Sequence, residues 1–484
     1  MQSSPVLVVG AGPAGLTAAY KLSQHGVQSI ILEKADRVGG ISRTETYKGY
    51  RFDIGGHRFF TKVKPVQQLW EEVLGDDFIQ VPRLSRIFYN GDFFQYPLEP
   101  LDVLSKIGVF HSTLMMASYM RRKLQPLAVE ENLEQWVTNR FGDRLYETFF
   151  KTYTEKVWGV PCTEICADWA AQRIKGLSLK KAVVNALFGS NDTKTLIKEF
   201  KYPVLGPGMM WERFQAKLTE KGSPTYLNTN VIQLEHEDRR ITQVIAEHDG
   251  QLLKLQPEQV ISSMPVSLLL QRLSPRPPKD VLVAAQSLKY RDFLIVPLIV
   301  NQAHLFPDNW IYIHSPELKV GRIQNFKNWS PAMVPDPSKT CLGMEYFCNE
   351  GDALWQMSDA ELVQFAAHEA VNLGVVRCLE DVEDGTVIRQ HKAYPVYDGE
   401  YTHHLNVLQN YLSQFKNLQT VGRNGTHRYN NQDHSMMTGL MGAENILGGN
   451  HNLWNVNTER SYHEEFIRAQ PTPKGTLKAL PAPG

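Results

Sequence analysis

A glycine-rich turn near the N-terminus constrains the fold of this chain more than any other stretch. The apolar run PVLVV at residues 5–9 predicts a buried strand, and GAGPAGL follows it directly. An apolar-periodic segment then continues to about Gln24, and QSIILEK predicts a second strand. Strand, glycine turn, helix and strand together predict a βαβ unit at the start of the chain.

The glycines of this turn have separate physical roles. Gly10 allows the tight turn, Gly12 allows the backbone to approach a pyrophosphate, and Gly15 allows close packing of helix on strand. Glu33 ends the second strand, where a carboxylate can accept from a ribose 2′-hydroxyl and would repel a 2′-phosphate. The unit therefore predicts a dinucleotide site, and the alternative is a plain glycine-rich turn.

Two further segments favour FAD over NAD. A second glycine pair with a following arginine comes soon after Glu33, and it resembles the extended flavoprotein fingerprint that also wraps the pyrophosphate. A Gly-Arg pair after a late strand resembles the third flavin-contacting segment of such enzymes. The resemblance implies bound FAD, with these segments formed by Gly39, Gly40, Arg43, Gly422 and Arg423.

The length of 484 residues predicts two or three domains. We expect an α/β fold, with a Rossmann-type FAD-binding domain built from residues 1–65, 205–270 and 410–460. Residues 100–204 have helical spacing and predict an inserted helical domain. Residues 66–99 and 271–409 predict a substrate domain with an antiparallel sheet, and the Pro-rich tail 461–484 is expected to be mobile.

Composition excludes several classes of partner. Lys+Arg and Asp+Glu each number 51, so no nucleic-acid partner or anionic surface is indicated. The longest apolar run, FLIVPLIV, is too short to span a bilayer and contains Pro297. Five cysteines fit free thiols in a reducing cytosol, without a pattern for a metal site. We therefore expect a cytoplasmic protein without a metal site, and the sequence does not indicate its oligomeric state.

Three blocks together resemble UDP-galactopyranose mutases, flavoproteins of the amine oxidase and protoporphyrinogen oxidase superfamily. The blocks are FDIGGHRFF at 52–60, FFKTYTEKVWGVPCTEICADWAAQRI at 149–174 and HRYNNQDHSMM at 427–437. The resemblance is patchy, but it runs in the same order from residue 5 to residue 447. It implies an enzyme that interconverts pyranose and furanose forms of a nucleotide-diphosphate sugar, with N5 of reduced FAD as the nucleophile at the anomeric carbon. NAD(P)H is implied as an external reductant.

The resemblance also implies roles for particular residues. Arg173 and Arg322 would hold the diphosphate with planar guanidinium forks, and His57 would respond to flavin reduction beside N5. Further substrate-binding residues are Tyr96, Trp158, Tyr312, Trp329, Tyr394, Tyr429 and Asn431. Further cofactor-binding residues are Gly56, Val231, Asn431, Gln432, Asp433 and Ser435. The alternatives are solvated arginines, core tyrosines, a hydrogen-bonded core histidine, and a polar loop in which Asp433 or Ser435 caps the last helix.

The blocks depart from the mutase pattern at three positions in the expected nucleotide pocket. Glu99 stands where an amide often contacts uracil, Thr154 replaces an asparagine, and Trp329 replaces a diphosphate-binding tyrosine. The sugar and the base therefore stay open. A second hypothesis is an FAD-dependent oxidase or desaturase, which predicts an aromatic-walled pocket. A third is an escort protein that has lost its FAD site, against which the intact glycine turn argues.

Overall fold

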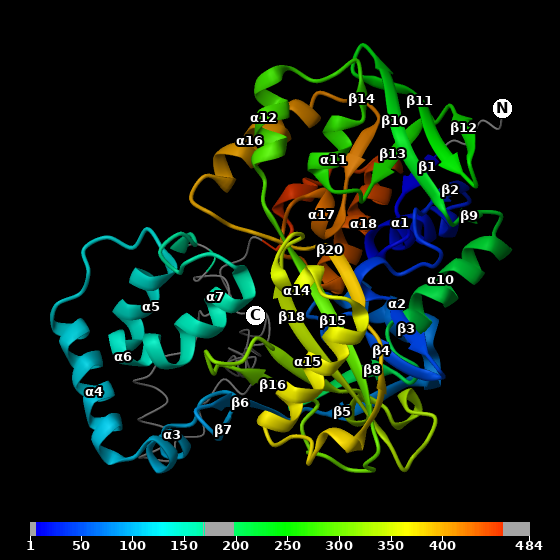
Figure 1. Ribbon diagram of the computed structural model, residues 1–484. Helices are drawn as coiled ribbons and strands as arrows, with labels where there is room; N and C mark the ends of the chain where they lie inside the picture. Colours follow the sequence, from blue (N-terminus) through cyan, green and yellow to red (C-terminus); the bar gives the residue numbers. More distant parts are fainter. Residues whose placement is uncertain (1–5, 168, 170–197, 458–484) are drawn as a thin grey trace, which may run out of the picture.

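The computed structural model describes residues 6–167, 169 and 198–457, and Figure 1 shows their arrangement. A five-stranded parallel sheet has the order β21-β13-β1-β2-β9. Both central strands are fully buried and consist of apolar or small residues, as expected for a parallel sheet covered on both faces. The strands are β1 (Val6–Val9), β2 (Ser29–Leu32), β9 (Thr225–Tyr226), β13 (Gln259–Ser262) and β21 (Leu418–Thr420). The predicted α/β fold class is confirmed.

Helices α1 (Pro13–Gln24) and α18 (Gln432–Ile446) pack closely together beside this sheet, although they come from opposite ends of the chain (Figure 1). Gly439 permits the contact, because a Cβ at this position would lie 2.2 Å from the carbonyl oxygen of Ala14. Helix α10 (Gly208–Glu220) packs against α1, and α2 (Lys64–Leu74) packs against α10 and α18. The first βαβ unit and the C-terminal helix therefore share one apolar core.

A smaller sheet of order β12-β11-β10-β14 adjoins the parallel sheet. Its strands are β10 (Thr229–Glu237), β11 (Arg240–His248), β12 (Gln251–Leu255) and β14 (Leu273–Ser274). Its apolar residues share a core with helices α11 (Val266–Gln271), α12 (Lys279–Ser287) and α16 (Tyr401–Leu412).

The largest sheet has the order β19-β15-β18-β17-β16-β6-β7, and β20 pairs with β15 beside β19. All neighbours are antiparallel except β6 and β16. The strands are β6 (Ser85–Tyr89), β7 (Asp92–Gln95), β15 (Tyr290–Val300), β16 (Trp310–Ile313), β17 (Arg322–Asn325), β18 (Thr340–Cys348), β19 (Val382–Gly385) and β20 (Ile388–Pro395). Helix α15 (Asp359–Asn372) covers its apolar side. Pro297 is tolerated in the middle of β15 because the neighbouring strand is interrupted there, between Gly385 and Ile388.

The predicted helical segment lies beside this large sheet (Figure 1). It contains α3 (Pro100–Ile107), α4 (Val109–Leu124), α5 (Leu133–Phe141) and α6 (Asp143–Tyr146). A π-helical turn, Glu147–Lys151, then leads without a break into α7 (Thr152–Trp158), which packs on β18. Shorter elements complete the fold: β3 (Thr44–Tyr47), β4 (Tyr50–Asp53), β5 (Phe78–Pro82), β8 (Glu199–Pro203), α13 (Phe326–Trp329), α14 (Ala353–Gln356) and α17 (Gly422–Gly425).

Some sequence-based expectations are not decided by this architecture. The division into three domains with the stated boundaries stays a prediction, and the tail 461–484 lies outside the described residues. Among the residues that the structure describes, no helix has the length and apolarity needed to cross a membrane.

Candidate active site

The glycine turn after β1 and the glycine pair after β2 face each other. Gly10 has a φ of +98°, and a Cβ at Gly15 would lie 1.9 Å from the carbonyl oxygen of Gly10. A Cβ at Gly12 would lie 3.8 Å from Cα of Gly40, and one at Gly40 would lie 3.3 Å from Cα of Gly12. No side chain therefore separates the two turns, and Gly39 joins them through its N–H, which donates to the Ala11 carbonyl (2.8 Å).

Glu33 is oriented by backbone groups at the end of β2. One carboxylate oxygen accepts from the N–H of Ala11 (2.7 Å) and the other from that of Ala35 (2.9 Å). Each oxygen retains acceptor capacity, since a carboxylate has about four lone-pair positions. The backbone carbonyl of Glu33 accepts from Thr229 (2.8 Å), two residues before Val231, which is buried on β10.

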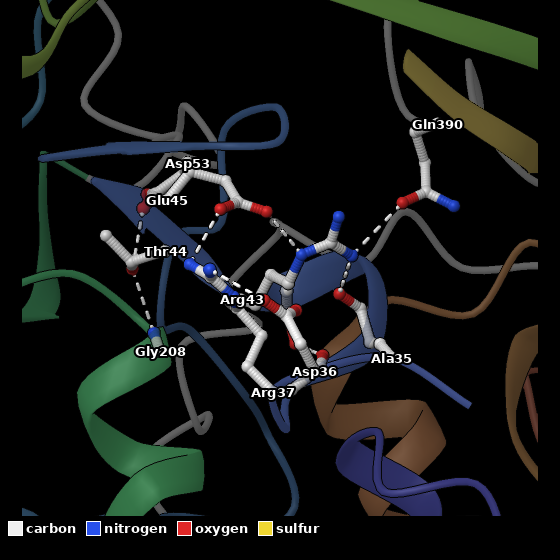
Figure 2. Close-up of polar contacts among 12 residues, drawn as sticks. Ala35, Asp36, Arg37, Arg43, Thr44, Glu45, Asp53, Gly208 and Gln390 are labelled. Carbon is white, nitrogen blue, oxygen red and sulfur yellow. Dashed lines mark hydrogen bonds and ion pairs between the residues drawn. The ribbon is translucent and has the colours of Figure 1, made fainter. Parts of the chain in front are cut away.

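Arg43 is fixed by polar contacts, and Figure 2 shows those with Glu45 and Gln390. Its Nε donates to Glu45 (2.6 Å), and its Nη1 donates to the Gly40 carbonyl (2.9 Å) and to Oε1 of Gln390 on β20 (3.2 Å). Arg37 holds the other oxygen of Glu45 (2.8 Å). Within the described part of the chain, Nη2 of Arg43 makes no hydrogen bond, so it remains available to an anion.

The late Gly-Arg segment closes over the N-terminal end of α1. Gly422 has a φ of +79°, and a Cβ there would lie 3.0 Å from Cβ of Ala14. Arg423 donates from Nε to the Asn430 carbonyl (2.8 Å) and from Nη1 to the Ala393 carbonyl (3.0 Å). Its guanidinium also lies over the ring of Tyr429, 4.9 Å from the centroid. Arg423 therefore connects the Gly-Arg segment to β20 through Ala393, and it also contacts Tyr429, a predicted substrate-binding residue.

The polar run before the last helix is a helix start, and Asn431 is its N-cap residue. The helix begins at Gln432, so the alternative in which Asp433 or Ser435 is the N-cap is wrong. The N–H of Asn431 donates to Nδ1 of His434 (3.4 Å), Gln432 donates to the carbonyl of Arg58 (3.1 Å), and Asp433 lies 3.2 Å from His434. Asp433 and Ser435 are buried. Side-chain capping and tertiary contacts thus account for part of this run.

One row of side chains crosses the large sheet beside these loops. Tyr312 on β16, Arg322 on β17 and Glu345 on β18 are direct cross-strand partners. Nε and Nη2 of Arg322 both lie 2.6 Å from the same oxygen of Glu345, a carboxylate without solvent exposure. Burial acts to lower the pKa of Arg322, but the charge of Glu345 outweighs it, so the pKa is raised well above its ordinary value. The guanidinium is therefore charged, fixed in orientation, and 18% exposed.

His57 lies in the loop that faces this row. A Cβ at Gly55 would lie 3.5 Å from Nη2 of Arg322 and 3.8 Å from the hydroxyl of Tyr394. Burial lowers the pKa of His57 to about 3, and the charge of Arg423 acts in the same direction. The neutral ring contacts the Gly55 carbonyl through Nδ1 (2.9 Å). Since a carbonyl only accepts, Nδ1 carries the proton and Nε2 is left as an acceptor.

Two aromatic groups flank the row. Tyr394 and Tyr429 are stacked at 5.5 Å with an interplanar angle of 18°, and the ring of Trp158 lies 5.8 Å from that of Tyr429. On the other side, the ring of Tyr96 lies 5.1 Å from that of Tyr312. Burial and the neighbouring Tyr429 raise the pKa of Tyr394, which keeps its hydroxyl protonated. The structure thus brings most of the predicted substrate residues together.

Two predicted positions, Arg173 and Trp329, are not assigned to this group. Arg173 lies outside the described residues. Trp329 is buried, and its indole N–H donates to the Asn309 carbonyl (2.9 Å), so this donor is used within the protein, and substrate binding by Trp329 stays a prediction. Its ring instead packs behind Gly56, where a Cβ would lie 3.3 Å from it. Of the departures from the mutase pattern, Thr154 is also buried, and Glu99 is exposed at the start of α3.

The sequence reasoning missed Glu345 and Arg83. Glu345 interrupts the apolar run TCLGMEYFC, and a charge inside a buried strand requires a partner, so this signal was present in the sequence. Arg83 lies with its guanidinium over the rings of Tyr96 (5.4 Å) and Trp310 (5.6 Å). Nothing local to Arg83 in the sequence indicates this position.

Comparison with known protein families identifies the family of this chain. The family described as flavin containing amine oxidoreductase matches residues 13–422. The chain belongs to this family. The family implies FAD as the cofactor, and the residues fit it: the two adjoining glycine turns carry no side chain that would keep a pyrophosphate away from their backbone, Glu33 is oriented, and Nη2 of Arg43 is available.

Curated relatives of this flavoprotein match only in part. A "Possible lysine-specific histone demethylase 1" of Drosophila melanogaster is 30% identical over 139 residues, which are 27% of this chain and 15% of that protein. A "Probable UDP-galactopyranose mutase" of Klebsiella pneumoniae is 26% identical over 181 residues, which are 35% of this chain and 44% of that protein. The chain therefore matches less than half the length of either relative.

Solved structures match the flavoprotein over nearly its whole length. A crystal structure of reduced UDP-galactopyranose mutase has a TM-score of 0.81 at 21% identity, covering 95% of this chain and 100% of the other. Wild-type putrescine oxidase bound to putrescine has a TM-score of 0.59 at 16% identity, covering 93% and 100%. At these identities the likeness shows a shared fold.

Proposed function

We propose that this flavoprotein is a mutase that interconverts the pyranose and furanose forms of a nucleotide-diphosphate sugar. The observation that carries the proposal is the charged Arg322, held by the buried Glu345 beside the Gly55–His57 loop. A fixed guanidinium next to the cofactor loop suits a diphosphate, because its planar N–H groups match phosphate oxygens. An apolar or amine substrate would have no use for it.

The surrounding side chains support this role. Nη1 of Arg322 makes no hydrogen bond among the described residues and is free to donate to a phosphate oxygen. Tyr312 is the cross-strand partner of Arg322, and the hydroxyl of Tyr394 lies beside Gly55, as does Nη2 of Arg322. Together they would retain the leaving diphosphate near the sugar, which favours its return. Arg173 remains the proposed second arginine that binds the diphosphate.

Bound FAD in its reduced form would supply the nucleophile for the anomeric carbon, and NAD(P)H is the proposed external reductant. The neutral His57 presents an acceptor nitrogen beside the cofactor loop, which suits a hydrogen bond from the cofactor or the sugar. We also propose that the protein acts in the cytoplasm, where its five free cysteines would stay reduced.

A second candidate function is an FAD-dependent oxidase or desaturase of the amine oxidase or protoporphyrinogen oxidase type. The stacked pair of Tyr394 and Tyr429, with Trp158 beside it, forms the aromatic wall that such an activity requires. The family match and the fold of putrescine oxidase agree equally with this candidate.

One experiment separates the two. The dithionite-reduced protein is mixed anaerobically with a panel of nucleotide sugars, including UDP-galactose, and the pyranose and furanose forms are separated. A mutase converts one form to the other without consuming reductant. If no sugar is converted and the oxidised protein consumes O₂ with an amine, porphyrinogen or polyene, the oxidase candidate takes its place.

A further inference from the structure

The connection between β16 and β17, residues 314–321, joins the two strands that carry Tyr312 and Arg322. Its ends meet through the N–H of Ile313, which donates to the carbonyl of Gly321 (2.9 Å). Any shift of this connection would move the guanidinium and the tyrosine hydroxyl relative to the cofactor loop. The contacts that hold the backbone of this connection therefore also determine the geometry of the site.

Lys156 of helix α7 holds three carbonyl groups of this hairpin. Its Nζ donates to the carbonyl oxygens of Ile313 (3.0 Å), Ser315 (3.1 Å) and Val320 (3.1 Å). An ammonium has three N–H donors, so all of them are used within the hairpin. Burial lowers the pKa of Lys156 to about 8, which agrees with an enclosed group rather than a solvated one.

Glu369 of helix α15 holds the N–H groups of the same connection. One carboxylate oxygen accepts from the N–H of Lys319 (2.5 Å) and the other from that of Val320 (3.0 Å). The peptide groups on the two sides of Val320 are thus bound to opposite charges, one from each of two helices. Backbone groups that a strand partner would ordinarily satisfy are here satisfied by side chains.

Helix α7 also touches the hairpin through Tyr153, which precedes Lys156 by three residues and lies on the same helical face. The ring of Tyr153 stacks on His314 at 4.6 Å with an interplanar angle of 9°. It also meets the ring of Tyr312 edge-on at 5.5 Å. Lys156 and Tyr153 therefore fix both the connection and the first of the two strands.

From this geometry we infer that Lys156 is a positioning residue for the diphosphate site. Its three N–H donors all go to backbone carbonyl groups of the hairpin. It acts by clamping the β16–β17 connection to α7, with Glu369 as the opposing clamp, so that Arg322 and Tyr312 keep their orientation toward the Gly55–His57 loop. The expected effect of Lys156 on ligand binding rests on the proposed function. The expected effect of Lys156 on the hairpin does not depend on which substrate is bound.

The test compares Lys156→Met, which has similar length and no donors, with Lys151→Met, which changes an exposed lysine just before the same helix. Hydrogen exchange of a peptide covering residues 311–323 reports on the hairpin without any ligand. Binding of UDP and UDP-galactose to the FAD-loaded protein, by calorimetry, reports on the site. FAD content and thermal unfolding are measured for each variant, and Lys156→Arg tests rescue by another cation.

We expect Lys156→Met to speed exchange in the 311–323 peptide and to weaken binding of UDP and UDP-galactose, each by about tenfold. FAD content should match the wild type, Lys151→Met should change neither quantity, and Lys156→Arg should restore part of both. Unchanged exchange in the 311–323 peptide of Lys156→Met would overturn the inference. If Lys156→Met does not fold, Lys156→Gln, which keeps two N–H donors without the charge, is judged by the same criterion.

The two proposals fail differently. If the wild-type protein binds neither UDP nor UDP-galactose, the proposed function is wrong, while the exchange measurement still decides the role of Lys156. If the wild type binds and Lys156→Met exchanges faster but binds as tightly as the wild type, the clamp does not act on the site and the inference is overturned.

Discussion

Arg322 is bound to Glu345, its direct neighbour across two strands, through a carboxylate that has no contact with solvent. Such a pair costs desolvation and gives little net stability, but it fixes a charged group in one orientation. The pair therefore has value here as a means of aiming a guanidinium, and removing either partner should affect ligand binding more than it affects cofactor binding.

Replacing Arg322 with alanine should weaken binding of UDP-galactose by one to two decades, or about 1.5–3 kcal/mol, because charge-assisted hydrogen bonds are lost. Arg322→Lys should keep only part of the wild-type affinity, since an ammonium cannot make the planar contact. Calorimetry measures the affinity, and absorbance should show unchanged FAD. Arg240→Ala, an exposed position at the start of β11, is the control. Wild-type affinity in Arg322→Ala would contradict the mutase proposal.

Gly12→Ala tests the cofactor cradle separately from folding. The φ of Gly12 is −81°, which alanine tolerates, and the nearest atom to the new methyl is 3.8 Å away. The methyl would instead stand where the two glycine turns meet, and it would keep a pyrophosphate from coming close to the Gly12 backbone. We expect purified protein with little FAD and an apoprotein melting temperature like that of the wild type. Gly399→Ala, whose methyl meets nothing within 4 Å, should keep its FAD.

The ring of His57 should stay neutral across the physiological range. With a folded pKa of about 3 and an unfolded value near 6.5, the unfolded chain binds more protons between these values. Stability from this group is thus present above pH 6.5 and is lost as the pH falls toward 3. Nitrogen-15 NMR should show a proton on Nδ1 and none on Nε2 from pH 5 to pH 8, with His57→Asn assigning the signal. A charged ring at pH 6 would refute the assignment.

Asp53 should destabilise the fold as the pH rises. It is fully buried, and burial raises its pKa to about 7, although hydrogen bonds from Tyr202 and Thr44 (3.0 Å) oppose the rise. The hydrogen bond from Thr44 is visible in Figure 2. Because the folded pKa exceeds the unfolded value near 3.9, the contribution of Asp53 is full below pH 4 and is lost toward pH 7.

Chemical unfolding of Asp53→Asn and the wild type at pH 4 and pH 8 measures this effect. The difference in unfolding free energy should move in favour of the variant by at most about 4 kcal/mol between these conditions. Glu199→Gln, an exposed acid on β8, should show no such change. A difference that does not depend on pH would mean that Asp53 is ionised throughout.

Local signals predicted much of the fold. The glycine turn placed β1, α1 and β2. Helix α15 also has a local signal, because its N-cap Ser358 forms a capping box with Glu361. The last helix begins at Gln432 rather than about three residues later, because Asn431 caps it. The polar run was interpreted as a flavin contact, so its capping role was assigned to the wrong residues.

The site was less predictable where the strand register of the large sheet determines which side chains meet. The Arg322–Glu345 pair depends on which residues of β17 and β18 stand opposite each other, and that register is set by the whole sheet. The burial of Trp329 could not be predicted from the sequence, because it depends on Asn309 and on the approach of Gly56. Lys156 belonged to a recognised block, but its three carbonyl partners lie about 160 residues away in the chain.

The π-helical turn Glu147–Lys151 sets the rotational phase of everything that follows it in α7. Such a turn contains one residue more than an α-helical turn, and each residue of an α-helix advances the chain by about 100°. If the same residues formed regular α-helical turns instead, Tyr153, Lys156 and Trp158 would all be rotated by about 100° away from their partners. The π-helical turn thus places the side chains of the hairpin clamp and of the aromatic wall together, and a related sequence with one residue fewer at this point could keep both with a regular helix.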